Sequence, residues 1–161
     1  MGRNMTNTSP SADTAAFSRK HALDVLAAAP VSLLAEHYSR LATEMPAASA
    51  VRGPEIGTVM VRGKIGGGGA AYNLGEASVT RATVKLETGE VGHSIILGRD
   101  QGKARIVAHL DALRQVSNWQ QRIDDEITRP ILLVISEEKQ QRAEETEATK
   151  VDFFTVTRGE D

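Results

Sequence analysis

Hydrophobic residues recur every three or four positions over two stretches in the first third of the chain. This spacing predicts two amphipathic helices. Their apolar positions are Ala22, Leu23, Leu26, Ala27, Leu34, Tyr38, Leu41 and Met45. Asp13 is suited to cap the first helix, Pro30 to end it and open the second, and Pro46 to close the pair. Such a pair must bury its apolar stripe against another element.

From about residue 55 the hydrophobic period changes from helical to extended. Alternating positions over 55–65, 70–74, 79–87 and 90–97 predict strands, because successive side chains of a strand point to opposite faces. Thr88-Gly89 is suited to a hairpin turn between the last two. We therefore expect an antiparallel meander of three to four strands.

The same alternation predicts which faces of the last two strands are buried. The apolar faces carry Ala82, Val84 and Leu86 in one strand and Val91, His93, Ile95 and Leu97 in the other. His93 is therefore expected to be a hydrogen-bonded histidine of the core.

The region after the meander returns to helical spacing. Asp100 is placed to cap a helix that runs to about residue 117, and a second helical stretch covers 119–127 before Pro130 breaks it. The apolar run 131–135 fits either a helix or a strand by periodicity. We interpret it as extended, because Ser136 and the acidic residues after it resemble the N-terminus of a further, charged helix.

The chain is expected to end in a strand over 151–158, with Phe153 and Phe154 on opposite faces. The complete pattern predicts an α+β fold: an N-terminal helical pair, the meander, C-terminal helices and this closing strand. A length of 161 residues suits one domain over 14–161. The polar residues 1–13 are expected to form a disordered tail.

Composition excludes several classes of function. The chain has 21 acidic and 19 basic residues and only 4% aromatics, which argues against nucleic acid as a partner. It has no cysteine, which excludes disulfides, iron-sulfur clusters and thiolate nucleophiles. No apolar run approaches the length of a membrane span and residues 1–13 lack a signal-peptide core, so a cytoplasmic location is expected.

Glycines and arginines provide the candidate phosphate site. The loop containing Gly66, Gly67 and Gly69 could turn backbone N–H groups toward a phosphate, and Arg81 and Arg99 could bind its oxygens. Each feature also has a structural interpretation. The loop could simply connect two strands, Arg81 could be solvated, and Arg99 could pair with a local acid beside the Asp100 cap.

No catalytic or metal site is predicted. The spacing of His21, His37, His93 and His109 provides no compact pair of metal ligands, and no nucleophile lies beside a base in the sequence. Taken without any family, the residues also allow a stand-alone phosphate- or nucleotide-binding module that uses the loop at 66–69, or an independent small hydrolase.

An ordered set of short motifs nevertheless resembles the PhnG family, the small subunits of the bacterial carbon-phosphorus lyase system. The motifs occur in this order: Arg19, His21, Gly57, Gly66-Gly67, Gly69, Gly75, Val79-Thr80-Arg81-Ala82, Gly89, Gly92, Gly98-Arg99-Asp100, Asp111-Ala112-Leu113, Val151-Asp152-Phe153-Phe154-Thr155 and Arg158-Gly159. The resemblance extends over residues 19–159.

This resemblance implies a hetero-oligomeric core complex with PhnH, PhnI and PhnJ. It further implies that PhnG, PhnH and PhnI act with PhnL to transfer the ribose triphosphate moiety of ATP to an alkylphosphonate, with release of adenine. MgATP would then be the substrate of the complex, and this chain alone would bind no cofactor. The chain is expected to support PhnI without a catalytic residue of its own, through an interface that includes Leu34, Tyr38, Phe153 and Phe154.

Overall fold

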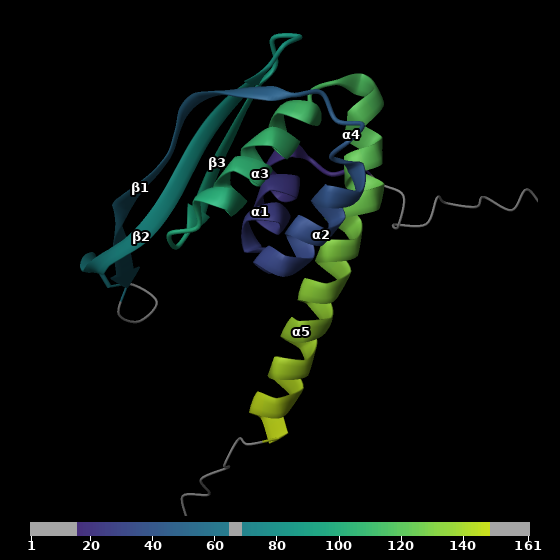
Figure 1. Ribbon diagram of the computed structural model, residues 1–161. Helices are drawn as coiled ribbons and strands as arrows, with labels where there is room; N and C mark the ends of the chain where they lie inside the picture. The colour runs from purple at the N-terminus through teal and green to yellow at the C-terminus, as the bar shows by residue number, and fades with distance from the viewer. Residues whose placement is uncertain (1–15, 65–68, 149–161) are drawn as a thin grey trace, which may run out of the picture.

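The computed structural model describes residues 16–64 and 69–148, and its helices lie on one face of a single antiparallel sheet (Figure 1). In chain order the elements are α1 (Arg19–Ala28), α2 (Val31–Leu41), β1 (Ala48–Lys64), β2 (Ala71–Leu86), β3 (Val91–Leu97), α3 (Gln101–Leu113), α4 (Ser117–Ile123), the π-helical turn η2 (Asp124–Thr128) and α5 (Arg129–Ala148). The α+β class and the N-terminal helical pair are therefore confirmed. The predicted closing strand 151–158 and the tail 1–13 lie outside the described residues.

The helical pair begins and ends close to the predicted positions. Ser18 caps α1 by accepting a hydrogen bond from the His21 N–H at 3.2 Å, whereas Asp13 lies outside the described residues. Pro30 is the N-cap residue of α2. The Lys103 Nζ on α3 donates to the Ala27 carbonyl at 2.6 Å, which satisfies an acceptor in the last turn of α1.

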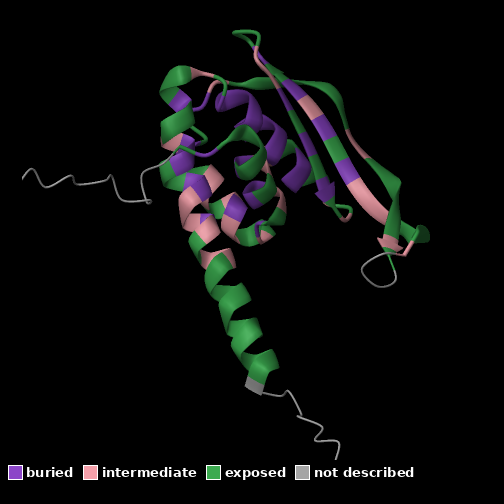
Figure 2. Cartoon of the chain, turned by 180° about the vertical axis from the view of Figure 1, so that it is seen from behind, coloured by how far each residue is buried: buried purple, intermediate pink, exposed green. Residues whose placement is uncertain are grey.

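The sheet has the order β1-β2-β3, and two of its strands are longer than predicted. The segments 70–74 and 79–87 form one strand, β2, which pairs with β1 from Ala71 to Leu86 with three register shifts. β1 likewise begins at Ala48 rather than near residue 55. Both strands extend beyond the helices as an arm, residues 56–64 and 71–77, on which nearly all residues are exposed (Figures 1 and 2).

The predicted face of β3 is wrong. Gly92, Ser94 and Ile96 face the helices, and His93 is exposed, in hydrogen-bond contact with Thr83 at 3.1 Å. The physical reason is the close approach of α3. A Cβ atom on Gly92 would lie 2.0 Å from the Ala108 carbonyl oxygen, so the face with the smallest side chains is the one that packs.

The prediction for 131–135 is also wrong, because these residues belong to α5, and Pro130 does not break the helix. In η2 the Arg129 N–H donates to the Asp124 carbonyl, five residues back. Pro130 has no N–H for the Glu126 carbonyl, and that oxygen instead accepts from His37 Nδ1 at 2.9 Å. The π turn and His37 thus accommodate the proline inside a continuous helical segment.

The core lies between the sheet and the helices, where the buried residues are concentrated (Figure 2). Its largest fully buried apolar side chains are Leu26, Leu34, Leu86, Ile96, Leu110, Leu113, Ile123, Ile127 and Ile131. The Ala82, Val84 and Leu86 face of β2 is buried as predicted. Leu34 has no exposed surface, so the structure assigns it to the core and not to a surface that a partner could contact.

Candidate functional site

The residues of the predicted phosphate site lie far apart. Gly69 lies two residues before Ala71, at the tip of the arm, whereas Arg81 lies about ten residues farther along β2 from Ala71, which is roughly 30 Å at the rise of a strand. Gly66 and Gly67 lie outside the described residues. The structure therefore does not bring Gly69 and Arg81 to one phosphate group.

Arg81 already has an acidic partner. Its Nε donates to Glu55 Oε1 at 2.7 Å, and Arg52 donates to the same oxygen. The hydrogen bond from Arg52, with a smaller contribution from Arg81, lowers the pKa of Glu55. A phosphate bound here would have to compete with this carboxylate, so the predicted role of Arg81 as a phosphate ligand stays a prediction.

The junction between β3 and α3 is built as a helix cap. Asp100 Oδ1 accepts from the Lys103 N–H at 2.8 Å, and Gly98 adopts a φ of 96° that favours glycine. Thr80 Oγ1 donates to the Gly98 carbonyl at 2.8 Å. Arg99 is exposed beside this cap. The motif Gly98-Arg99-Asp100 thus has a complete structural explanation, and anion binding by Arg99 remains a prediction.

A second group of polar residues, whose contacts the sequence did not predict, joins α1 and β3 to α3. Arg19 donates to both carboxylate oxygens of Asp111, from Nε at 2.8 Å and from Nη2 at 2.6 Å. The His93 N–H donates to the same carboxylate at 2.9 Å. The hydrogen bond to Asp111 raises the pKa of Arg19. Arg19 and Asp111, two positions of the motif set, therefore join α1, β3 and α3 to one another.

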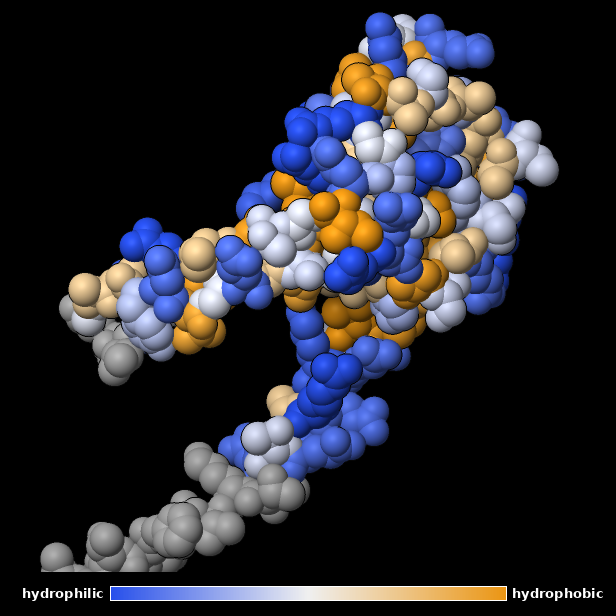
Figure 3. All heavy atoms as spheres, turned by 60° about the vertical axis from the view of Figure 1, so that its left-hand side comes forward, coloured by the Kyte–Doolittle hydropathy of each residue, from blue (hydrophilic) through white to orange (hydrophobic). Residues whose placement is uncertain are grey.

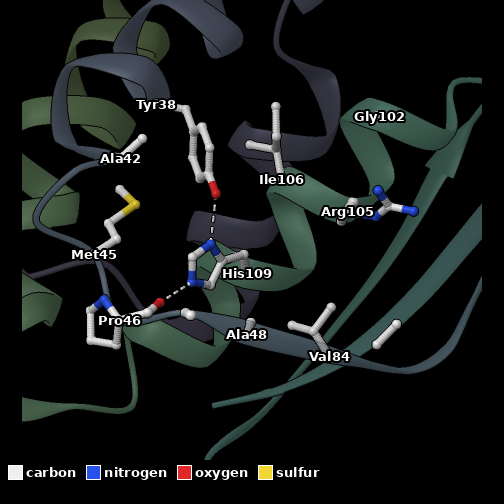
Figure 4. Close-up of a pocket in the computed structure, with 12 residues that line it drawn as sticks. Tyr38, Ala42, Met45, Pro46, Ala48, Val84, Gly102, Arg105, Ile106 and His109 are labelled. Carbon is white, nitrogen blue, oxygen red and sulfur yellow. Dashed lines mark hydrogen bonds between the residues drawn. The ribbon is translucent and has the colours of Figure 1, made fainter. Parts of the chain in front are cut away.

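A cavity of about 580 Å³ opens between α2, α3 and the start of β1 (Figure 4). His109 lies on its wall, where Nε2 is 2.8 Å from the Pro46 carbonyl oxygen and Nδ1 is 2.7 Å from the Tyr38 hydroxyl. Because a carbonyl only accepts, Nε2 carries the proton and neutral Nδ1 accepts from Tyr38. Both ring nitrogens are engaged within the chain, so His109 joins the loop after α2 to α3 and has no free nitrogen for proton transfer.

We expect His109 to make the free energy of unfolding depend on pH. Burial lowers the pKa of His109, so below about pH 6.5 the unfolded chain takes up a proton more readily than the folded chain. Stability should fall as the pH is lowered through this range, by about 1.4 kcal/mol for each unit of difference in pKa. Urea denaturation between pH 5 and 8 should show a shallower pH dependence for His109→Gln than for the wild type. If the free energy of unfolding changed equally with pH in the two proteins, His109 would not be the cause of the pH dependence.

The outer face of the sheet, opposite the helices, is charged around Arg52, Glu55 and Arg81 and becomes apolar toward the arm. Leu97, Val79 and Gly57 lie opposite one another across the three strands, as do Ala77 and Val59, and Gly75 and Val61. Leu97 is 77% exposed and Ile95 67%. Hydrophobic residues are visible on the arm and the body between hydrophilic ones (Figure 3). We call Val59, Val61, Ala77, Val79, Ile95 and Leu97 the outer patch.

The described residues contain no cluster of three or more His, Asp or Glu side chains that could hold a metal ion. None of the described helices is long and apolar enough to cross a bilayer. What the geometry offers instead is a sheet whose outer face is uncovered and carries the outer patch beside the charged group of Arg52, Glu55 and Arg81. Tyr38, predicted at an interface, is half-buried against His109, and Phe153 and Phe154 lie outside the described residues.

Comparison with known proteins identifies the family. A family model described as phosphonate metabolism protein PhnG matches residues 17–159. The alpha-D-ribose 1-methylphosphonate 5-triphosphate synthase subunit PhnG of Rhizobium meliloti (strain 1021) is 45% identical over 149 residues, which cover 92% of this chain and 94% of that protein. The chain therefore belongs to the PhnG family of phosphonate metabolism proteins.

Proposed function

We propose that this chain is the PhnG subunit of an alpha-D-ribose 1-methylphosphonate 5-triphosphate synthase. The observation that carries the proposal is the 45% identity to a protein of that name, over nearly the full length of both chains. The synthase transfers the ribose triphosphate moiety of MgATP to an alkylphosphonate and releases adenine. Its other subunits are PhnH and PhnI, which act with PhnL, and PhnJ completes the core complex.

Within this complex the chain has a supporting role, and the nucleosidase chemistry belongs to PhnI. Two features favour that division. The polar side chains of Asp111 and His109 form their hydrogen bonds with other groups of this chain. The outer patch, in contrast, is largely exposed, and much of it lies where β1 and β2 extend beyond the helices. A partner subunit on this patch would remove apolar surface from water.

The activity test uses reconstituted subunits. Adenine release from MgATP and methylphosphonate is measured for PhnH, PhnI and PhnL with and without this chain. We expect release only when the chain is present, and none from the chain alone. Undiminished release without the chain would refute the proposal, and activity of the isolated chain would favour the stand-alone alternative.

A charge in the outer patch should weaken assembly. Val59→Glu places a carboxylate on a strand position that is 45% exposed, where it leaves the core untouched but becomes a buried charge in the complex. We expect at least about a tenfold loss in affinity for PhnI, measured by co-purification and by titration. Leu133→Glu is the matched control, since Leu133 is 54% exposed on α5. Equal binding by both variants would exclude the outer patch as the contact.

A further inference from the structure

The edge of β3 that faces away from β2 offers unpaired backbone groups. The hydrogen bonds Leu86 N–H to Glu90 O, at 2.9 Å, and Gly98 N–H to Ser78 O, at 2.8 Å, fix the phase of the ladder. In an antiparallel pair, alternate residues direct both backbone groups toward the partner strand. The odd-numbered residues of β3, from Val91 to Leu97, therefore direct theirs to the open edge.

Asp111 of α3 and Gln115, two residues after the end of that helix, form hydrogen bonds with the edge only at Val91 and His93. The Val91 carbonyl accepts from Gln115 Nε2 at 2.7 Å, and the His93 N–H donates to Asp111 at 2.9 Å. The Val91 carbonyl and the His93 N–H therefore point to the open edge, as expected for odd-numbered residues of β3. Among residues 16–64 and 69–148, no hydrogen-bond partner is found for the N–H or carbonyl of Ile95, which occupies the next position along the edge. An added strand could pair with it.

The surroundings of this edge favour a strand that is apolar on both faces. On the helix side, a hollow of about 270 Å³ separates α1 from β3; its apolar lining is Leu23, Ala27, Ile95 and Val107, and its polar lining is Asp24, His93 and Ser94. On the outer side, Ile95 and Leu97 are largely exposed. Side chains on both faces of an added strand would thus contact hydrophobic neighbours.

We propose that residues 151–158 of a second copy of this chain add to β3 as a fourth strand. The segment is rich in β-branched and aromatic residues, which favour strands. Phe153 and Phe154 are adjacent, so in a strand they point to opposite faces. One aromatic ring would enter the hollow beside α1, and the other would cover Ile95 and Leu97, which leaves Val59, Val61, Ala77 and Val79 of the outer patch for a partner subunit.

The direction of α5 favours a second copy over the chain's own segment. Ile131 and Ile135 contact the core, but the helix from Ser136 onward is exposed and carries the chain about 20 Å farther from it (Figures 1 and 2). Only residues 149 and 150 separate α5 from the segment, and they span at most about 7 Å. The course of α5 therefore favours β3 of a second copy over the chain's own, and reciprocal exchange between two copies would form a two-fold dimer.

The absence of native cysteine makes disulfide cross-linking a direct test. Full-length chains carry Ile95→Cys together with either Thr155→Cys or Val156→Cys, so that one of the two positions shares a face with Ile95. After oxidation we expect a covalent dimer on a non-reducing gel for one of the pairs. Val59→Cys in place of Ile95→Cys is the matched control, because Val59 is also exposed but lies on β1.

Light scattering of the uncross-linked protein gives a second readout. The full chain should be a dimer at micromolar concentration, and the chain ending at residue 148 should be a monomer. A Phe153→Ser/Phe154→Ser variant should dissociate at least about tenfold more readily. An intramolecular cross-link, equal cross-linking of the Val59 control, or a monomeric full-length chain would overturn the proposal. None of these results depends on the synthase activity, so the two proposals can fail separately.

Discussion

Replacement of Gly92 by alanine is expected to destabilise the fold severely. A Cβ atom at this position would lie 2.0 Å from the Ala108 carbonyl oxygen, 2.4 Å from the Ala112 nitrogen and 2.8 Å from the Ala112 Cβ. Two of these neighbours are backbone atoms of a buried helix, which cannot rotate away as a flexible side chain can. The new methyl group must therefore push α3 off the sheet.

The structure leaves α3 little freedom to move. Ser94 Oγ donates to the Ala104 carbonyl at 2.6 Å, and Asp111 holds the His93 N–H at 2.9 Å. Displacing the helix would break these bonds as well as the apolar contacts of Val107 and Leu110. Overpacking of a core costs about 1–3 kcal/mol, and we expect Gly92→Ala to reach about 3 kcal/mol or more. This is a large part of the total stability of a typical domain.

Urea denaturation followed by Trp119 fluorescence and circular dichroism measures the loss. Gly57→Ala is the matched control, because that glycine is also in a strand of the same sheet but has nothing within 4 Å of its added Cβ. The control should change the free energy of unfolding by less than about 1 kcal/mol, in either direction. Similar midpoints for the two variants would show that α3 is not as close to β3 as the structure places it.

Gly92 also illustrates what the sequence could and could not predict. Periodicity correctly predicted the helical pair, the hairpin at Thr88-Gly89 and the Asp100 cap, because those signals are local. It failed for β3, where His93 and Ile95 seemed to form the buried face. The choice of face depends on how closely α3 approaches, and a glycine in a strand does not reveal which helix will lie against it.

The error at 131–135 has a similar cause. Pro130 predicts a helix break from local geometry alone. The helix continues because η2 shifts the hydrogen bonds, and because His37, from α2, occupies the carbonyl of Glu126. That compensation comes from a residue almost ninety positions earlier. The spacing of residues in the sequence likewise does not predict long-range contacts such as the hydrogen bond between Tyr38 and His109.

A second large effect is expected from the buried ion pair between Arg114 and Asp124. Their side chains are only 4% and 3% exposed, with Nε to Oδ1 at 2.7 Å and Nη2 to Oδ2 at 3.0 Å. Arg114 Nη2 also donates to the Phe17 carbonyl at 2.9 Å. The pair therefore joins the end of α3 to η2 and to the segment before α1.

Arg114→Met should lower the free energy of unfolding by about 3–5 kcal/mol, because it leaves the Asp124 carboxylate buried without its partner. The double variant Arg114→Met/Asp124→Leu removes both charges and should regain most of that loss. Lys20→Met is the surface control. Lys20 pairs with Asp24 at 2.6 Å, but the two side chains are 86% and 60% exposed, so the change should cost less than about 1 kcal/mol.

Urea denaturation at pH 7 of these three variants and the wild type provides a double-mutant comparison. If the double variant were as unstable as Arg114→Met, the cost would come from lost packing and from the Phe17 hydrogen bond, and not from an unpaired charge. If Arg114→Met were no worse than Lys20→Met, water would have to reach Asp124 in the folded chain. We expect the free energy of unfolding of Arg114→Met to be far below that of the other three proteins. This order requires that water is excluded from the junction between α3 and η2. The helix α5 begins at this junction and runs away from the sheet.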